Sequence, residues 1–141
     1  NEKRRVHSLG NLYSNSYMKV SGRGDQKKKL NIMKLFKFNI AFENEISNGY
    51  VTEKILHSFY SNTIPIYWGS DQVKVDFNKK AFIFCDDFEN DDDLIKKIIN
   101  ISNNKKEIQK YLNEPVFTDN KIPDFVKPDN VLKFLTNIIE S

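Results

Sequence analysis

Between residues 36 and 69 the chain alternates apolar runs with a helical pattern, which narrows the folds open to it. A period of two predicts a strand with one strongly buried face, formed by Phe36, Phe38, Ile40 and Phe42. A polar loop follows, and apolar residues then recur at helical spacing between Val51 and Ser61. Residues 63–68, TIPIYW, predict a second strand, where Pro65 removes one ladder donor and argues for an edge strand or a strand end.

The alternation continues towards the C-terminus. Residues 81–85, AFIFC, predict a third strand, and an acidic stretch then precedes the helical pattern LIKKIINI. A last helix is predicted after Pro128, with an inward face made of Val131, Leu132, Leu135, Ile138 and Ile139. Strands that alternate with helices favour an α/β fold with a Rossmann-like parallel sheet. Such folds bind ligands at the carboxyl ends of the strands.

Composition indicates one globular domain over residues 1–141, with 39% hydrophobic and 29% charged residues. The net charge of +3 allows an anionic ligand, but no aromatic RNA-binding signature lies beside the basic clusters, so nucleic acid is not expected as a partner. No apolar run is long enough to cross a membrane, and no signal peptide is visible. The single cysteine, Cys85, is expected to act as a small buried hydrophobe.

The polar loop and the helix start carry the candidate chemistry. Glu43 and Asn44 end the first strand, and Asn48-Gly49 is a turn pair in which glycine can take a positive φ. Tyr50, Glu53 and Lys54 then fall at the start of the helix, where free backbone N–H groups favour phosphate. Lys54 adds a full positive charge, and Glu53 can accept hydrogen bonds from ribose hydroxyls.

A plainer interpretation stands beside this one. Glu53 and Lys54 are good helix formers on a solvated turn, and Asn-Gly is an ordinary connection. The segment contains neither GxxxxGK nor GxGxxG, so it matches no common phosphate loop. The acidic stretch DDFENDDD lacks the glycine of a calcium loop and fits helix capping better than a metal site.

Several ordered pieces of residues 36–88 resemble the signature region of the α-1,3/4-fucosyltransferases. In that family a strand ends in Phe-Glu-Asn, a Tyr-Val-Thr-Glu-Lys helix start follows, and an Ile-Pro-Ile-Tyr-Trp-Gly strand and an Asp-Phe pair come next. This chain carries FENE, GYVTEK, IPIYWG and VDF in that order. It departs at Glu45, Asn48-Gly49 and Ala81, where the family usually has other residues.

The resemblance implies specific roles for residues of this chain. It implies the C-terminal, donor-binding half of a GT-B-type glycosyltransferase that uses GDP-fucose, with no metal or further cofactor. Lys54 would bind the diphosphate, Glu53 the ribose and Tyr50 the phosphates, with Asn44 near the nucleoside. Glu43 is also expected among the substrate-binding residues. A diphosphate-binding arginine upstream of the motif is assigned to Arg5, with Arg4 as the alternative.

The resemblance also implies a reaction: inverting transfer of L-fucose to an N-acetylglucosamine-containing glycan in α-1,3 or α-1,4 linkage. The family's base is a glutamate of an N-terminal acceptor domain, for which too few residues precede the motif. We therefore expect donor binding without efficient transfer by this chain alone. A non-catalytic nucleotide-binding or interaction module, or a transferase using another GDP-sugar, is the alternative. The lone cysteine favours a cytoplasmic location, or the Golgi lumen for a eukaryotic parent.

Overall fold

The computed structural model describes residues 5–9, 14–20 and 25–140 of the chain. Helices and strands alternate from Phe38 to Phe84, as the sequence predicts, and helices follow. The elements are α1 Gln26–Met33, β1 Phe38–Phe42, α2 Glu53–Tyr60, β2 Ile64–Trp68, α3 Val73–Asp76, β3 Ile83–Phe84, η1 Cys85–Asp87, α4 Asp91–Asn103, α5 Lys105–Asn113, η2 Thr118–Asn120, η3 Asp124–Val126 and α6 Pro128–Glu140.

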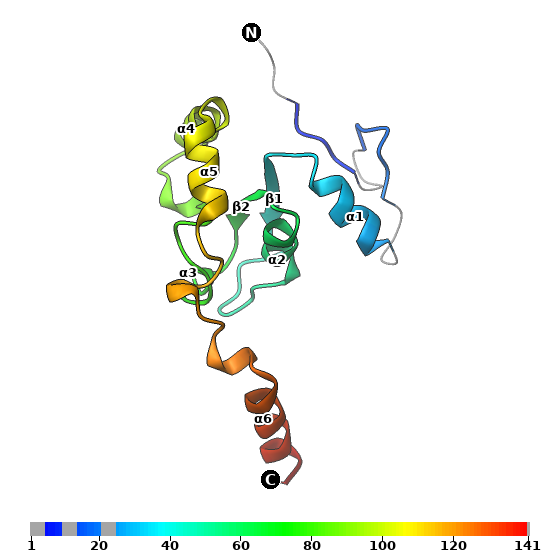
Figure 1. Cartoon of the computed structure of the whole chain (residues 1–141), viewed down its shortest axis with the longest axis vertical. Coiled ribbons are helices and arrows are strands. Elements are labelled where there is room, and N and C mark those ends of the chain that lie inside the picture. Colours follow the sequence, from blue (N-terminus) through cyan, green and yellow to red (C-terminus); the bar gives the residue numbers. More distant parts are fainter. Residues whose placement is uncertain (1–4, 10–13, 21–24, 141) are drawn as a thin grey trace.

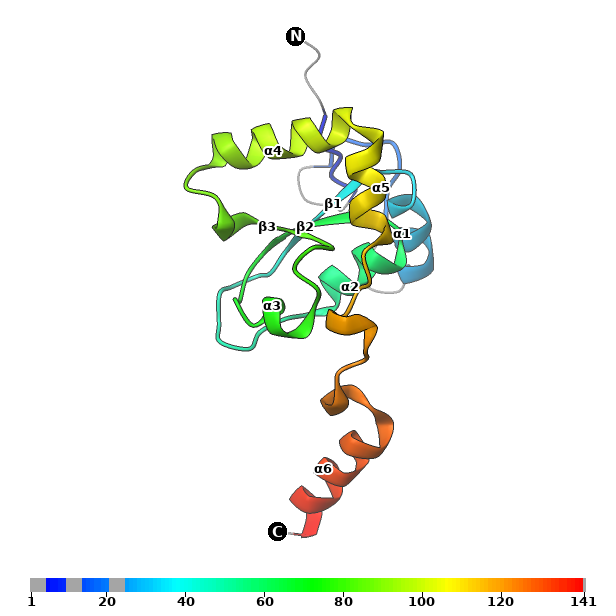
Figure 2. The ribbon, with the colours of Figure 1, turned by 60° about the vertical axis from the view of Figure 1, so that its left-hand side comes forward.

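The three strands form one parallel sheet in the order β1-β2-β3. β1 and β2 pair along their whole length, from Phe38 opposite Ile64 to Phe42 opposite Trp68. β3 is short and pairs with β2 only through Ile83 and Phe84. Because all three strands run the same way, the loops that follow them leave from one edge of the sheet (Figure 1 for β1 and β2, Figure 2 for β3). The predicted α/β fold with a parallel sheet is confirmed.

Helices cover both faces of this sheet (Figure 2). On one face α2 packs over β1 and β2, and the buried cluster contains Ala41, Ile55, Tyr67, Phe82 and Phe84. On the other face α4 and α5 cover a cluster built on Ile64, Ile66, Ile83 and Ile101. Side chains that alternate along each strand thus feed two separate cores, as expected for a sheet buried between helix layers.

Pro65 is the second residue of β2, the central strand, so the edge-strand alternative is wrong and the strand-end alternative fits. The Ile64 N–H donates to the Lys37 carbonyl on the β1 side, at 2.9 Å. Backbone N–H groups point alternately to the two sides of a strand, so the Pro65 nitrogen faces the β3 side. β3 pairing begins one residue later, at Ile66, so no ladder bond needs a donor from Pro65.

The strongly buried face predicted for β1 is also wrong in its outer part. Ile40 is 49% exposed and Phe42 is 43% exposed, whereas Ala41 and Glu43 on the opposite face are buried. In the residues that the structure describes, β1 has a neighbouring strand only on its β2 side. The cluster beneath α4 and α5 is centred on β2 and β3, which leaves the outer part of β1 uncovered.

The last helix forms where it was predicted but does not face inward. α6 begins at Pro128, and Leu132, Leu135, Ile138 and Ile139 are all exposed, Ile139 to 83%. Figure 2 shows α6 extending away from the sheet below α2 and α3. Helical periodicity identified an amphipathic helix correctly but cannot identify what its apolar face contacts.

Candidate functional site

The loop of residues 44–52 joins the carboxyl end of β1 to α2. Gly49 adopts a φ of 76°, which confirms the positive φ expected for the Asn48-Gly49 turn. The Tyr50 N–H donates to the Ser47 carbonyl at 3.0 Å, and the Gly49 N–H donates to Ser70 Oγ at 3.2 Å. The second bond fastens this loop to the residues that follow β2, so two strand ends are held together.

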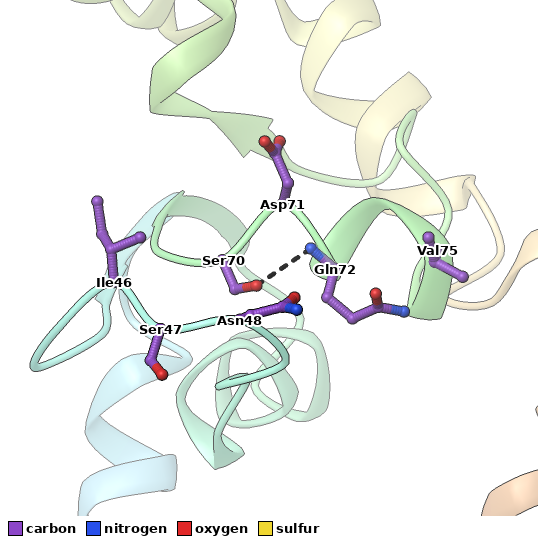
Figure 3. A pocket seen from close by; sticks show the side chains of 7 residues that line it. All are labelled: Ile46, Ser47, Asn48, Ser70, Asp71, Gln72 and Val75. Atoms are coloured by element: carbon purple, nitrogen blue, oxygen red, sulfur yellow. Dashed lines mark hydrogen bonds between the residues drawn. The ribbon is translucent and has the colours of Figure 1, made fainter.

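A cavity of about 410 Å³ lies between these two loops. Figure 3 shows its walls, which come from the loop after β1 and from the loop and helix after β2. Its lining residues are Ile46, Ser47, Asn48, Ser70, Asp71, Gln72 and Val75. The carboxyl edge of a parallel sheet, where this hollow lies, is where α/β folds bind ligands.

Glu43 directly follows β1, and its side chain is fully buried. Its Oε1 accepts a hydrogen bond from the Thr52 backbone N–H at 2.8 Å, and its Oε2 accepts from Thr52 Oγ1 at 2.6 Å. Lys54 Nζ lies 2.9 Å from Oε2 and forms an ion pair with it. Burial raises the pKa of the Glu43 carboxyl, but the bonds from Thr52 and Lys54 outweigh burial and hold the pKa below its ordinary value of 4.5.

The other predicted residues around α2 reach the surface. Lys54 keeps 26% of its side chain exposed beyond its contact with Glu43. Glu53 and Asn44 are exposed, and Tyr50 is half-buried. Of these residues, the structure brings Glu43 and Lys54 into contact, and Asn44, Tyr50 and Glu53 lie on the adjoining loop and the first turn of α2.

Arg5 lies apart from this group. Its Nη2 donates to the Asn15 carbonyl at 3.0 Å, and two residues later the His7 ring packs on Phe36, with 5.3 Å between ring centroids. Phe36 precedes the amino end of β1, whereas the other predicted residues follow its carboxyl end. Arg4 lies outside the described residues. The assignment of either arginine to a diphosphate stays a prediction.

The start of α2 leaves backbone donors available. Thr52 is its N-cap, yet the Thr52 side chain makes no capping hydrogen bond. The first N–H groups of a helix have no partner within the helix, and they carry partial positive charge. Together with the Lys54 ammonium, these groups suit an anion such as a phosphate.

Among the residues that the structure describes, no group of three or more His, Cys, Asp or Glu side chains is placed to hold a metal ion. Burial, followed by the charges of Asp86 and Asp91, raises the pKa of Cys85 to about 11. Its thiol therefore stays protonated near neutral pH and is a poor nucleophile. No described helix is long and apolar enough to cross a bilayer.

The C-terminal domain model of glycosyltransferase family 10, the fucosyltransferases, matches residues 1–115. The chain belongs to this family. Among its relatives, this fucosyltransferase domain is 50% identical over 72 residues to the α-(1,3)-fucosyltransferase FucT of Helicobacter pylori. That match covers 51% of the domain and 15% of the H. pylori enzyme.

Solved structures extend the similarity to nearly the whole fucosyltransferase domain. A crystal structure of α1,3-fucosyltransferase with GDP aligns with 96% of this chain and 39% of its own, at a TM-score of 0.84 and 34% identity. A crystal structure of α1,3-fucosyltransferase with GDP-fucose aligns over 96% and 40%, at a TM-score of 0.81 and 33% identity. The chain thus spans about two fifths of the solved enzymes that it matches.

The cavity residues that follow β2 in this fucosyltransferase domain were not identified from the sequence. Ser70, Asp71 and Gln72 line the cavity but were not singled out. They follow the second strand immediately, so the rule that ligands bind at strand carboxyl ends pointed to them. The buried pairing of Glu43 with Lys54 left no signal, since the two residues are 11 positions apart and share no periodic pattern.

Proposed function

We propose that this fucosyltransferase domain binds GDP-fucose at the start of α2. The observation that carries the proposal is the position of Lys54 in the first turn of α2, directly after the loop whose residues 46–48 line the cavity, at a helix start with available N–H groups. The similar solved structure with GDP-fucose supports the choice of ligand.

Each side chain then has a distinct contact. Lys54 and the first N–H groups of α2 bind the diphosphate, whose negative charge complements both. Exposed Glu53 accepts hydrogen bonds from the ribose hydroxyls, and Tyr50 donates to a phosphate oxygen. Asn44 lies beside the nucleoside. None of these groups needs a metal ion to act.

The reaction proposed for the complete enzyme is inverting fucosyl transfer to an N-acetylglucosamine-containing glycan, in α-1,3 or α-1,4 linkage. The bond from the anomeric carbon to the diphosphate oxygen breaks as a bond to the acceptor oxygen forms. The electron pair leaves with GDP, and a carboxylate takes the acceptor proton. Lys54 and the α2 N–H groups stabilise the charge that develops on GDP.

No described residue is assigned as that base, and we propose that the N-terminal acceptor domain of a longer polypeptide supplies it. The chain alone is then expected to bind the donor and to transfer fucose poorly. Efficient transfer to N-acetyllactosamine by this chain would contradict that part of the proposal.

Calorimetry with GDP, GDP-fucose, GDP-mannose and UDP tests the donor. We expect guanine nucleotides to bind and UDP not to bind. Lys54→Ala should lower the affinity for GDP by about tenfold or more, because a charge-assisted contact is lost. Glu53→Ala should weaken it by less. Lys27→Ala, which removes an exposed charge from α1, is the matched control and should leave the affinity unchanged.

The alternatives give different results in the same experiment. A preference for GDP-mannose over GDP-fucose would indicate a transferase of another GDP-sugar. No binding of any nucleotide would favour a non-catalytic interaction module.

A further inference from the structure

The Glu43 carboxylate is surrounded by donors from three parts of the site. Its Oε1 accepts from the Thr52 N–H and, at 3.4 Å, from the Tyr67 hydroxyl at the end of β2. Its Oε2 accepts from Thr52 Oγ1 and from Lys54 Nζ. Burial, and then the neighbouring Glu43 charge, raise the pKa of Tyr67, so its hydroxyl stays protonated and able to donate.

No ligand reaches Glu43 in this conformation. Its side chain has no exposed surface, and Gly69 closes over it. A Cβ atom at Gly69 would lie 2.7 Å from Glu43 Cγ and 2.7 Å from the Tyr67 hydroxyl, so the residue after β2 packs as closely as a glycine permits. Any effect of Glu43 on a bound donor must therefore pass through Thr52 or Lys54.

We propose that Glu43 is a positioning residue for the donor site, acting through Lys54 and Thr52. This inference rests on the proposed binding of GDP-fucose. The sequence predicted that Glu43 contacts the substrate directly. The proposal gives Glu43 an indirect role instead.

The ion pair restricts the long side chain of Lys54. When an unrestrained lysine side chain binds an anion, several of its rotatable bonds become fixed, and it loses conformational entropy. Lys54 is already held 2.9 Å from a buried carboxylate, and part of its side chain stays exposed. An ammonium group has three N–H donors, so one bond to Glu43 leaves donors for a phosphate.

The second contact keeps the start of α2 open. A threonine at an N-cap usually accepts a hydrogen bond from the helix's own first-turn N–H groups. Here the Thr52 hydroxyl donates to Glu43 Oε2, and its side chain does not cap α2. Glu43 thereby holds Thr52 in an orientation that leaves these N–H groups for the ligand.

A double-mutant cycle read by calorimetry with GDP tests whether Glu43 acts through Lys54. Glu43→Gln keeps the size of the side chain and an oxygen for the Thr52 N–H but removes the charge that holds Lys54. We expect GDP to bind about tenfold more weakly to Glu43→Gln than to the wild type. In a Lys54→Met background the same change should alter the affinity by less than about twofold.

Glu45→Gln is the matched control, because it removes an exposed carboxylate from the same loop. It should leave GDP affinity within about twofold of the wild type, since solvent and salt screen the charge of an exposed carboxylate. Thermal unfolding of each variant shows whether weaker binding comes from loss of the fold or from displacement of Lys54 and Thr52 in a folded protein. If Glu43→Gln does not fold, Thr52→Val reads the same network, because it removes only one donor to Glu43, and about threefold weaker binding is expected.

The outcomes separate the two proposals. Absence of GDP binding to the wild type overturns the proposed function, and this inference with it. Wild-type binding with an equal effect of Glu43→Gln in both backgrounds overturns the inference alone. Unchanged or tighter binding by Glu43→Gln also overturns it, because the carboxylate would then oppose the anion more than it orients Lys54.

Discussion

The site region, made of β1, α2, β2 and the loops that join them, and the C-terminal arm, residues 118–140, are built in opposite ways. In the site region, residues from the start of α2 and the end of β2 enclose Glu43, and Ile55 and Tyr67 are completely buried. In the arm, helix α6 is just as regular, yet it has no buried residue. Burial therefore indicates better than regular secondary structure which residues contribute most to the free energy of unfolding.

The contrast predicts that the largest loss of stability follows from a cavity beneath α2. Ile55→Ala should lower the free energy of unfolding by about 3 kcal/mol, because Ile55 has no exposed surface and its cluster is closely packed. Urea unfolding followed by circular dichroism measures it. Leu56→Ala, at the exposed next position of α2, is the control and should cost under about 1 kcal/mol. Equal losses would show that α2 is not anchored by its inner face.

Two glycines of the site region differ in how closely they are packed, and alanine substitutions measure that difference. Gly69→Ala should cost about 2 kcal/mol, since the new Cβ would overlap Glu43 and Tyr67. Gly49→Ala should cost about 1 kcal/mol, from its positive φ alone, because an added Cβ there meets no atom within 4 Å. The same unfolding experiment compares them. A Gly49 variant that loses more than the Gly69 variant would contradict the close packing over Glu43.

A smaller, pH-dependent effect is expected at Glu43. Its pKa is lower in the folded protein than its ordinary value of 4.5, so its contribution to stability is present above that value. The contribution is lost as the pH falls through the folded-state pKa. Glu43→Gln should therefore be less stable than the wild type at pH 7, with a difference that narrows below pH 4.5.

Chemical unfolding at several pH values measures that difference. Glu45→Gln, which removes an exposed carboxylate from the same loop, controls for the change in net charge. A difference between Glu43→Gln and the wild type that stays constant from pH 7 to pH 3 would show that the Glu43 charge does not stabilise the fold.

The sequence predicted local features better than contacts. The parallel sheet, the Gly49 turn and the start of α6 follow from periodicity and from turn and helix-start chemistry, which act over a few residues, whereas α2 begins at Glu53, two residues after its predicted start at Val51. Exposure of Ile40 and of the α6 apolar face depends on which other elements are near, and periodicity carries no such information. The Glu43–Lys54 pair likewise arises only when β1 and α2 are folded together.

The smallest effect is expected in the C-terminal arm. Leu132→Ala should change the free energy of unfolding by no more than about 0.5 kcal/mol, although the same loss of side-chain atoms is costly in a core. Leu132 is 65% exposed, so its removal leaves no cavity and returns little apolar surface to water. Urea unfolding measures the change, and Lys133→Ala, on the opposite face of α6, controls for the effect of alanine on the helix itself. A loss of 2 kcal/mol or more for Leu132→Ala alone would mean that its side chain is buried in solution, and the contrast between the two regions would then fail.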